Sequence, residues 1–151
     1  LTLITCFVHT PTASAATSAP RTRTIITKDD CGGHYVETIT ETSPLSPYGI
    51  SPYSATAATV DRTKSIAYYN SSNSLCWHYS LTGTFRYITG LSSVCTNSKA
   101  KLLIYNPAYS LYSEKHSHSG STATGTIKIR KQTLITTKTI SITCSKNGTF
   151  S

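Results

Sequence analysis

The chain of 151 residues is long enough for one domain of ordinary size. Charged residues make up 13% of it, about half the usual share, while Thr and Ser are abundant. Its 14 Lys and Arg residues against 6 Asp and Glu give a net charge of +8, which attracts polyanions without specifying a fold. No stretch reaches the roughly 18 consecutive apolar residues of a membrane span, so stable membrane insertion is not expected.

The first 15 residues predict export. Leu1–Val8 is uncharged and mostly apolar, and Ala13-Ser14-Ala15 has the small residues that precede a signal-peptide cleavage site. We interpret residues 1–15 as a signal-peptide remnant, with the mature chain starting near Ala16; the alternative is the disordered tail of a cytosolic protein. The predicted location is therefore extracellular, either secreted or associated with the cell surface.

Residues 16–60 are expected to form a variable, poorly ordered segment. Prolines, which lack the N–H donor of a central strand, punctuate it at positions 20, 44, 47 and 52. The exception is residues 34–41, where strand-forming side chains follow a turn signal at Asp29–Gly33. We predict an edge strand there.

A regular strand pattern runs through residues 61–151. Residues 75–87 alternate between apolar and polar side chains, the pattern of a strand with one buried and one solvated face. The other predicted strands are 64–70, 91–96, 101–105, 108–115, 122–130 and 134–144. About seven short antiparallel strands without a helical period predict an all-β, immunoglobulin-like β-sandwich with a loosely structured N-terminal extension.

Cysteine usage agrees with export. Cys6 lies in the signal-peptide remnant, which leaves Cys31, Cys76, Cys95 and Cys144 in the mature chain. An even number in a short exported chain predicts two disulfide bridges, with three possible pairings. We favour Cys95–Cys144, because both lie in phase with core residues of their strands. The polar-face position of Cys76 then suits a bridge to Cys31 in the N-terminal segment.

Four segments of the domain carry a family resemblance: the run Trp77–Phe85, the segment around Cys95, residues 123–126, and the ending Ile142–Ser151. They resemble a family of small secreted proteins of Gram-positive, clostridia-like bacteria, a domain of unknown function. The resemblance covers about residues 60–151. It implies export and a sandwich-like fold, and it transfers no catalytic residues. Cys31 and Cys76 are not positions of the family pattern.

Catalytic and metal motifs are weak. Past Val60 the only carboxylates are Asp61 and Glu114, which share no motif, so a glycosidase-type carboxylate pair is not expected. His116 and His118 face one side of a strand and are weak metal candidates, but zinc needs three or four ligands. We expect no metal and no cofactor. A small extracellular hydrolase that uses His116, His118 or Cys76 is one alternative function.

Binding motifs are the other functional signal. Arg86, Lys128 and Arg130 lie on outward faces of predicted strands and form an anion-binding strip if those strands are neighbours. The ten tyrosines offer stacking surfaces for sugars. No Gly-rich phosphate loop joins a strand to a helix, and nucleic acid is not an expected partner. We predict a monomeric, non-catalytic secreted protein of unknown function; the alternatives are a cell-surface module that binds wall polymer or another polyanionic glycan, the hydrolase above, and a toxin-like effector.

Overall fold

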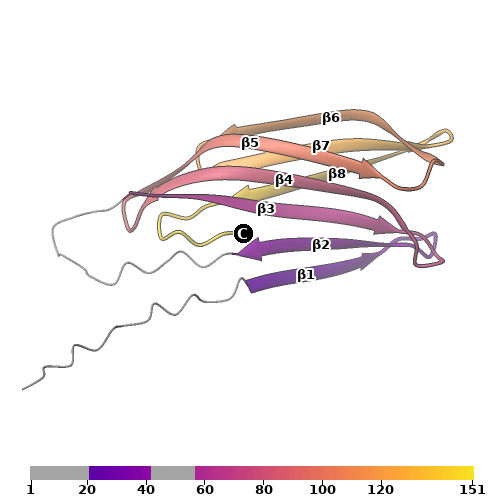
Figure 1. Ribbon diagram of the computed structural model, residues 1–151, viewed down its shortest axis with the longest axis horizontal. Coiled ribbons are helices and arrows are strands. Elements are labelled where there is room, and N and C mark those ends of the chain that lie inside the picture. The colour runs from indigo at the N-terminus through magenta and orange to yellow at the C-terminus, as the bar shows by residue number, and fades with distance from the viewer. Residues whose placement is uncertain (1–20, 42–56) are drawn as a thin grey trace, which may run out of the picture.

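The computed structural model describes residues 21–41 and 57–151 (Figure 1). The described chain is all-β, as predicted, with eight strands in two antiparallel sheets. None of its segments is a helix long and apolar enough to cross a membrane. The strands are β1 (Arg21–Lys28), β2 (His34–Glu41), β3 (Ala57–Tyr69), β4 (Leu75–Ile88), β5 (Ser92–Ile104), β6 (Tyr109–Ser119), β7 (Thr122–Lys131) and β8 (Leu134–Thr143).

Both sheets are meanders. The larger has the order β1-β2-β3-β4-β5 and the smaller β6-β7-β8, so every pair of neighbours is consecutive in sequence. Short turns favour this connectivity, because antiparallel neighbours need no crossover. The immunoglobulin-like arrangement expected from the sequence instead has Greek-key connections and about seven strands. The prediction of a two-layer β architecture is confirmed, while this strand order differs from the immunoglobulin topology.

The N-terminal part is more ordered than the sequence predicts. Residues 16–60 contain all of β1 and β2 and the start of β3, and only residues 16–20 and 42–56 of this segment lie outside the described residues, as does the signal-peptide remnant 1–15. The strand at residues 34–41 is confirmed with its bounds, but it is not an edge strand, because β1 pairs along its whole length. The Thr and Ile residues of β1 are strand formers, and pairing with β2 along its whole length supplies the ladder that completes the strand.

The bounds of β5 differ from the sequence prediction. The sequence predicts two strands at 91–96 and 101–105, whereas the structure has one strand from Ser92 to Ile104. The polar residues between the two expected strands stay in the ladder because β4 pairs with them on both sides of a bulge at Thr84 and Phe85. A long partner strand therefore carries a local sequence that is not strand-like by itself.

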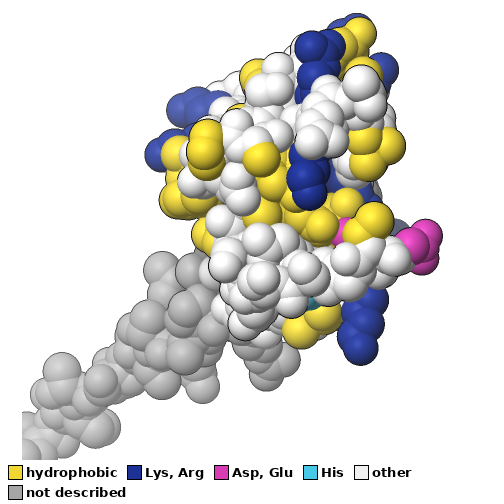
Figure 2. All heavy atoms as spheres, turned by 90° about the vertical axis from the view of Figure 1, so that its right-hand side faces the viewer, with side chains coloured by type: hydrophobic (Ala, Val, Ile, Leu, Met, Phe, Trp, Pro, Cys, Tyr) yellow, Lys and Arg dark blue, Asp and Glu magenta, His cyan; other side chains and the backbone are white. Residues whose placement is uncertain are grey.

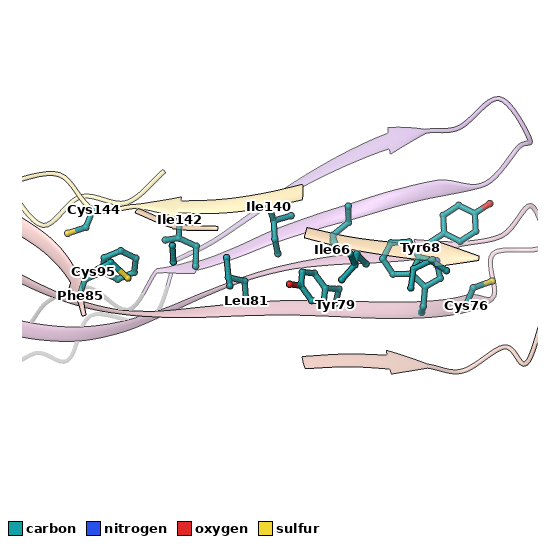
Figure 3. Close-up of a cluster of buried hydrophobic side chains, with 14 of the residues drawn as sticks. Ile66, Tyr68, Cys76, Tyr79, Leu81, Phe85, Cys95, Ile140, Ile142 and Cys144 are labelled. Carbon is teal, nitrogen blue, oxygen red and sulfur yellow. The ribbon is translucent and has the colours of Figure 1, made fainter. Parts of the chain in front are cut away.

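The core lies between the sheets. The inward face of β4 provides its centre, with Trp77, Tyr79, Leu81 and Phe85 at most 2% exposed. Figure 3 shows Tyr79, Leu81 and Phe85 in this row. Strand β7 covers β4 and β5, and β8 lies over β3. The smaller sheet ends there, so β1 and β2 extend beyond it (Figure 1).

Two glycines set how closely the sheets approach. A Cβ at Gly83 would lie 2.6 Å from the ring of Phe85 and 3.0 Å from Cβ of Ala123 on the opposite sheet. A Cβ at Gly125 would meet the hydroxyl of Tyr79 and lie 3.2 Å from Leu81. Side chains at these two positions would push the layers apart, since a close-packed interior has no room for an added methyl group.

We therefore expect Gly83→Ala to lower the free energy of unfolding by about 1–3 kcal/mol, the usual cost of overpacking. Urea denaturation measures the loss. The control is Ser80→Ala on the solvent face of the same strand, which should stay within about 0.5 kcal/mol of the parent. Equal stability of the two variants would contradict a close contact at Gly83.

Candidate binding pocket

One end of the sandwich carries a cluster of four aromatic rings. Tyr35 of β2, Tyr68 of β3 and Trp77 of β4 are direct partners across the larger sheet, all on its inner face. The Tyr68 ring centroid lies 4.9 Å from that of Tyr35, 6.0 Å from that of Trp77 and 5.9 Å from that of Tyr109. Trp77 and Tyr68 are buried, whereas Tyr35 and Tyr109 are half-buried and reach the rim.

Two lysines of the smaller sheet stand over these rings. Nζ of Lys138 lies 3.5 Å from the centroid of Tyr35, and Nζ of Lys131 lies 5.3 Å from that of Tyr109. Such contacts place a positive charge against the negative face of a ring. Figure 2 faces this end and shows Lys and Arg side chains beside exposed hydrophobic ones.

The four rings and Lys131 surround a small hollow, which we call the aromatic pocket, and Lys138 lies beside it over Tyr35. Its volume is about 90 Å³. Tyr35, Tyr68, Trp77, Tyr109 and Ile129 supply its apolar walls, and Lys131, Thr136, Asp29, Cys31 and Leu134 complete the lining. The pocket therefore combines flat aromatic surface with a cationic rim.

Asp29 closes the rim through a tight turn between β1 and β2. Its Oδ1 accepts hydrogen bonds from the backbone N–H of Gly33 at 2.6 Å and of Cys31 at 3.0 Å. Its Oδ2 accepts one from the Tyr68 hydroxyl at 2.7 Å. The Tyr68 hydrogen bond is the largest cause that lowers the pKa of Asp29 below its usual value.

Two tyrosines of the pocket, Tyr68 and Tyr35, have a raised pKa and stay neutral. Burial, followed by the hydrogen bond to Asp29, raises the pKa of Tyr68 far above that of a free phenol. Burial also raises the pKa of Tyr35. The Tyr68 hydroxyl is engaged as a donor to Asp29, while the half-buried rings of Tyr35 and Tyr109 reach the rim. This chemistry suits recognition of a polar, ring-shaped ligand with negative charge.

The predicted anion-binding strip is not assembled. Arg86 lies on the outer face of the larger sheet, where β4 pairs with β3 and β5. Lys128 and Arg130 lie on the outer face of the smaller sheet, and the guanidinium of Arg130 is 4.7 Å from the centroid of the Tyr112 ring. The strip required β4 and β7 to be neighbours in one sheet, and they are in different sheets.

The histidine pair lies on the exposed strand β6. Nδ1 of His116 is 3.1 Å from Oε1 of Glu114, and His118 is exposed. Across residues 21–41 and 57–151, no three His, Cys, Asp or Glu side chains are grouped so that they could hold a metal ion. The two histidines therefore remain weak metal candidates without a third ligand in the described chain.

The described cysteines are free thiols, where the sequence predicts bridges Cys95–Cys144 and Cys31–Cys76. Cys76, Cys95 and Cys144 are buried and Cys31 is exposed. Cys95 and Cys144 lie at the same end of the core, and Cys76 lies at the other (Figure 3). Since Cys76 is 0% exposed, its thiol is not accessible to a substrate in this structure.

Sequence reasoning missed most of the aromatic pocket. It treated the tyrosines only as a group that offers stacking surfaces, and it did not single out Tyr35, Lys131 or Lys138. The available signal was the shared inward phase of Tyr68 and Trp77 on adjoining strands. The lysines were not predictable, because their positions over the rings depend on how the two sheets pack.

Fold and site together define a two-layer, all-β protein with an aromatic and cationic pocket at one end. No protein-family model matches the chain, and no curated protein matches it. A solved structure of a hypothetical protein from Listeria monocytogenes aligns with 87% of this chain and 94% of its own length. The identity is 16% and the TM-score 0.46, which gives no information about function.

The pocket turn makes stability depend on pH through Asp29. A lowered pKa in the folded state stabilises the protein above the unfolded-state pKa of about 3.9, and this contribution is lost as the pH falls through the folded value. Asp29→Asn should cost about 1–2 kcal/mol of unfolding free energy at pH 7, because hydrogen bonds to a charged acceptor are weakened.

Urea denaturation of parent and variant at pH 7 and at pH 3 measures this effect. The difference between them should shrink at pH 3. Asp30→Asn in the same turn is the control and should change stability little at either pH. A difference that is the same at both pH values would contradict a role for the Asp29 carboxylate.

Proposed function

We propose that this chain is a non-catalytic binding module of an exported protein, and that its aromatic pocket takes an acidic sugar of a polyanionic glycan, such as a cell-wall polymer. The observation that carries the proposal is the set of rings Tyr35, Tyr68, Trp77 and Tyr109 around the pocket. The ammonium group of Lys131 lies over Tyr109, and that of Lys138 lies over Tyr35.

The chemistry of the ligand follows from the two components of the pocket. A sugar ring has an apolar face of C–H groups that packs on aromatic side chains, while its hydroxyls need hydrogen-bond partners at the edge. Ligand sites of this kind combine apolar walls with a few placed polar groups. The two lysines add attraction for carboxylate or phosphate, and the net charge of +8 adds long-range attraction for a polyanion.

Export and family membership belong to the same proposal. The signal-peptide remnant at residues 1–15 and the resemblance to clostridia-like secreted proteins support an extracellular location. We propose that the two-layer architecture resembles that of immunoglobulin-like modules, in which the loops at the ends of the sandwich form a binding surface. It does not extend to the order of the strands.

The binding test uses size-fractionated oligogalacturonate as the acidic glycan and a malto-oligosaccharide of equal length as the neutral control. We expect isothermal titration to show binding of the acidic oligomer that weakens as salt rises. Tyr109→Ala and Lys131→Gln should each weaken it about tenfold, because each removes one element of the pocket while leaving the buried rings in place.

Two control variants identify the binding surface. Arg86 lies on the outer face of the larger sheet and Lys128 on the outer face of the smaller one. The variants Arg86→Gln and Lys128→Gln should therefore bind the acidic oligomer like the parent. Loss of binding in either control, with Tyr109→Ala unaffected, would locate the glycan on an outer face and refute the pocket. No binding of the acidic oligomer at low salt would also count against it.

Oxidation in an extracellular compartment gives a second test, on the cysteines. The backbone N–H of Cys95 donates to the carbonyl of Gly120, and that of Cys144 donates to the carbonyl of Ser121. Because Gly120 and Ser121 are consecutive, these two hydrogen bonds bring the cysteines together. Burial is the main cause that raises the pKa of Cys144, and the electrostatic effect of nearby Cys95 raises it further. We propose that Cys95 and Cys144 form a disulfide when the protein is exported.

Peptide mapping of the oxidised protein should find Cys95 linked to Cys144. In the chain-entropy model a bridge that closes a loop of about 50 residues stabilises by roughly 4 kcal/mol, so reduction should lower the unfolding midpoint of the parent and leave Cys95→Ser unchanged. Exposed Cys31 should react with an alkylating reagent in the native reduced protein well before the three buried thiols. Four equally reactive thiols in protein recovered from the culture medium would refute the bridge.

A further inference from the structure

The open edge of β8 is the feature with the clearest further use. Strand β8 pairs with β7 on one side, and no strand in the described ranges runs along the other side for its full length. The exception is at its end, where Thr143 and Ser151 exchange two backbone hydrogen bonds of 2.9 and 3.1 Å. Phe150 forms a bridge with Cys144 just before this pair. Residues 150–151 thus pair antiparallel with the end of β8.

The register of that pair shows which backbone groups remain for a longer strand. In an antiparallel ladder the N–H and C=O of alternate residues point to the same side. Thr143 directs both groups to the open edge, so Ser141, Thr139 and Thr137 direct theirs the same way. The free edge therefore extends from Ser141 back towards Leu134, in line with the two bonds already formed.

A partly uncovered surface lies under this edge. We call it the ledge: the inner-face residues Arg23 and Ile25 of β1, Glu37 and Ile39 of β2, and Lys64 of β3. Together with Ser151 they line a hollow of about 140 Å³. Ile25 is 45% exposed, because β1 and β2 extend beyond the smaller sheet. Figure 1 shows the C-terminal end of the chain between β8 and β2, above this surface.

The charge of the ledge indicates the chemistry of an occupant. Nζ of Lys64 lies 3.6 Å from Oε2 of Glu37, an ion pair that uses the carboxylate of the ledge. Arg23 on the ledge and Lys138 on the inner face of β8 add positive charge on either side. A strand in this position has every second side chain directed to the ledge. Apolar and acidic side chains at those positions complement it.

We propose that β8 binds an extended peptide segment of another protein by strand addition, with apolar and acidic side chains facing the ledge. The segment extends the ladder that Phe150 and Ser151 begin and completes the smaller sheet over β1 and β2. Main-chain hydrogen bonds supply affinity in this mode of recognition, and alternate side chains supply specificity. The proposal shares Lys138 with the glycan proposal and otherwise uses the β8 edge and the ledge rather than the aromatic rings.

The probe is a fluorescent ten-residue peptide that alternates Thr with Val and carries Glu at two of the Val positions. Fluorescence anisotropy should show binding, and hydrogen exchange followed by NMR should show slowed exchange at the amides of Ser141, Thr139 and Thr137. The same peptide N-methylated at its Thr residues loses the N–H groups that would face β8 and should not bind. Equal binding of both peptides would overturn the proposal without any change to the protein.

A matched pair of variants tests the edge itself. Thr137→Pro removes an N–H that points away from β7, which an edge strand tolerates, and it should weaken peptide binding roughly tenfold. Thr137→Val keeps the N–H and should bind like the parent. Thr137→Val should also bind oligogalacturonate normally, and the N-methylated peptide leaves the protein unchanged, so a failure of the aromatic pocket proposal is distinguishable from a failure here.

A charge exchange and a mass measurement complete the experiment. Arg23→Glu should weaken binding of the Glu-containing peptide and strengthen binding of the same peptide with Lys in place of Glu. An unchanged preference would overturn the assignment of acidic side chains to the partner. If the protein alone forms dimers in sedimentation that Thr137→Pro abolishes, the occupant is a second copy of the chain and the proposed partner is wrong.

Discussion

The packing of β4 against both of its neighbours and the opposite sheet is the interaction on which the rest of the structure depends. Its inward side chains Trp77, Tyr79, Leu81 and Phe85 form the centre of the core, and β3 and β5 pair with it along almost its whole length. Because burial of large apolar side chains is the main favourable term in folding, this strand holds the two layers together. Gly83 permits the close approach by leaving space for the Phe85 ring.

The aromatic pocket is the continuation of that core to the surface. The row Tyr35, Tyr68 and Trp77 crosses three strands at one register level, and it begins buried at Trp77 and ends half-buried at Tyr35. Tyr109 and the two lysines approach from the smaller sheet. The same side chains therefore stabilise the fold and line the pocket in which we propose that the ligand binds.

Unequal sheet width explains the second surface. Five strands face three, so one margin of the larger sheet has no partner layer among the described residues. An unpaired strand edge is a template for pairing with another chain, and natural proteins cover such edges or use them. Here Arg23, Glu37, Lys64 and Lys138 place charged groups on the uncovered margin, and the excess of positive charge favours an acidic partner.

The sequence by itself determined the class of fold, because alternation with period two in β4, β7 and β8 reports which face of each strand is buried. It also located β2 with its bounds and the inward phase of Cys95 and Cys144. It failed where pairing partners decide the outcome: β1 and the polar middle of β5 are strands because a neighbouring strand supplies their ladder. Only the tertiary structure decided which charges gather, since Arg86 and Lys128 share an outward phase but belong to different sheets, while Lys138 and Tyr35, about 100 residues apart in sequence, lie in contact. The alternation of apolar and polar residues reveals which face of a strand is buried. Strand order and sheet packing, which long-range contacts set, determine what that face contacts.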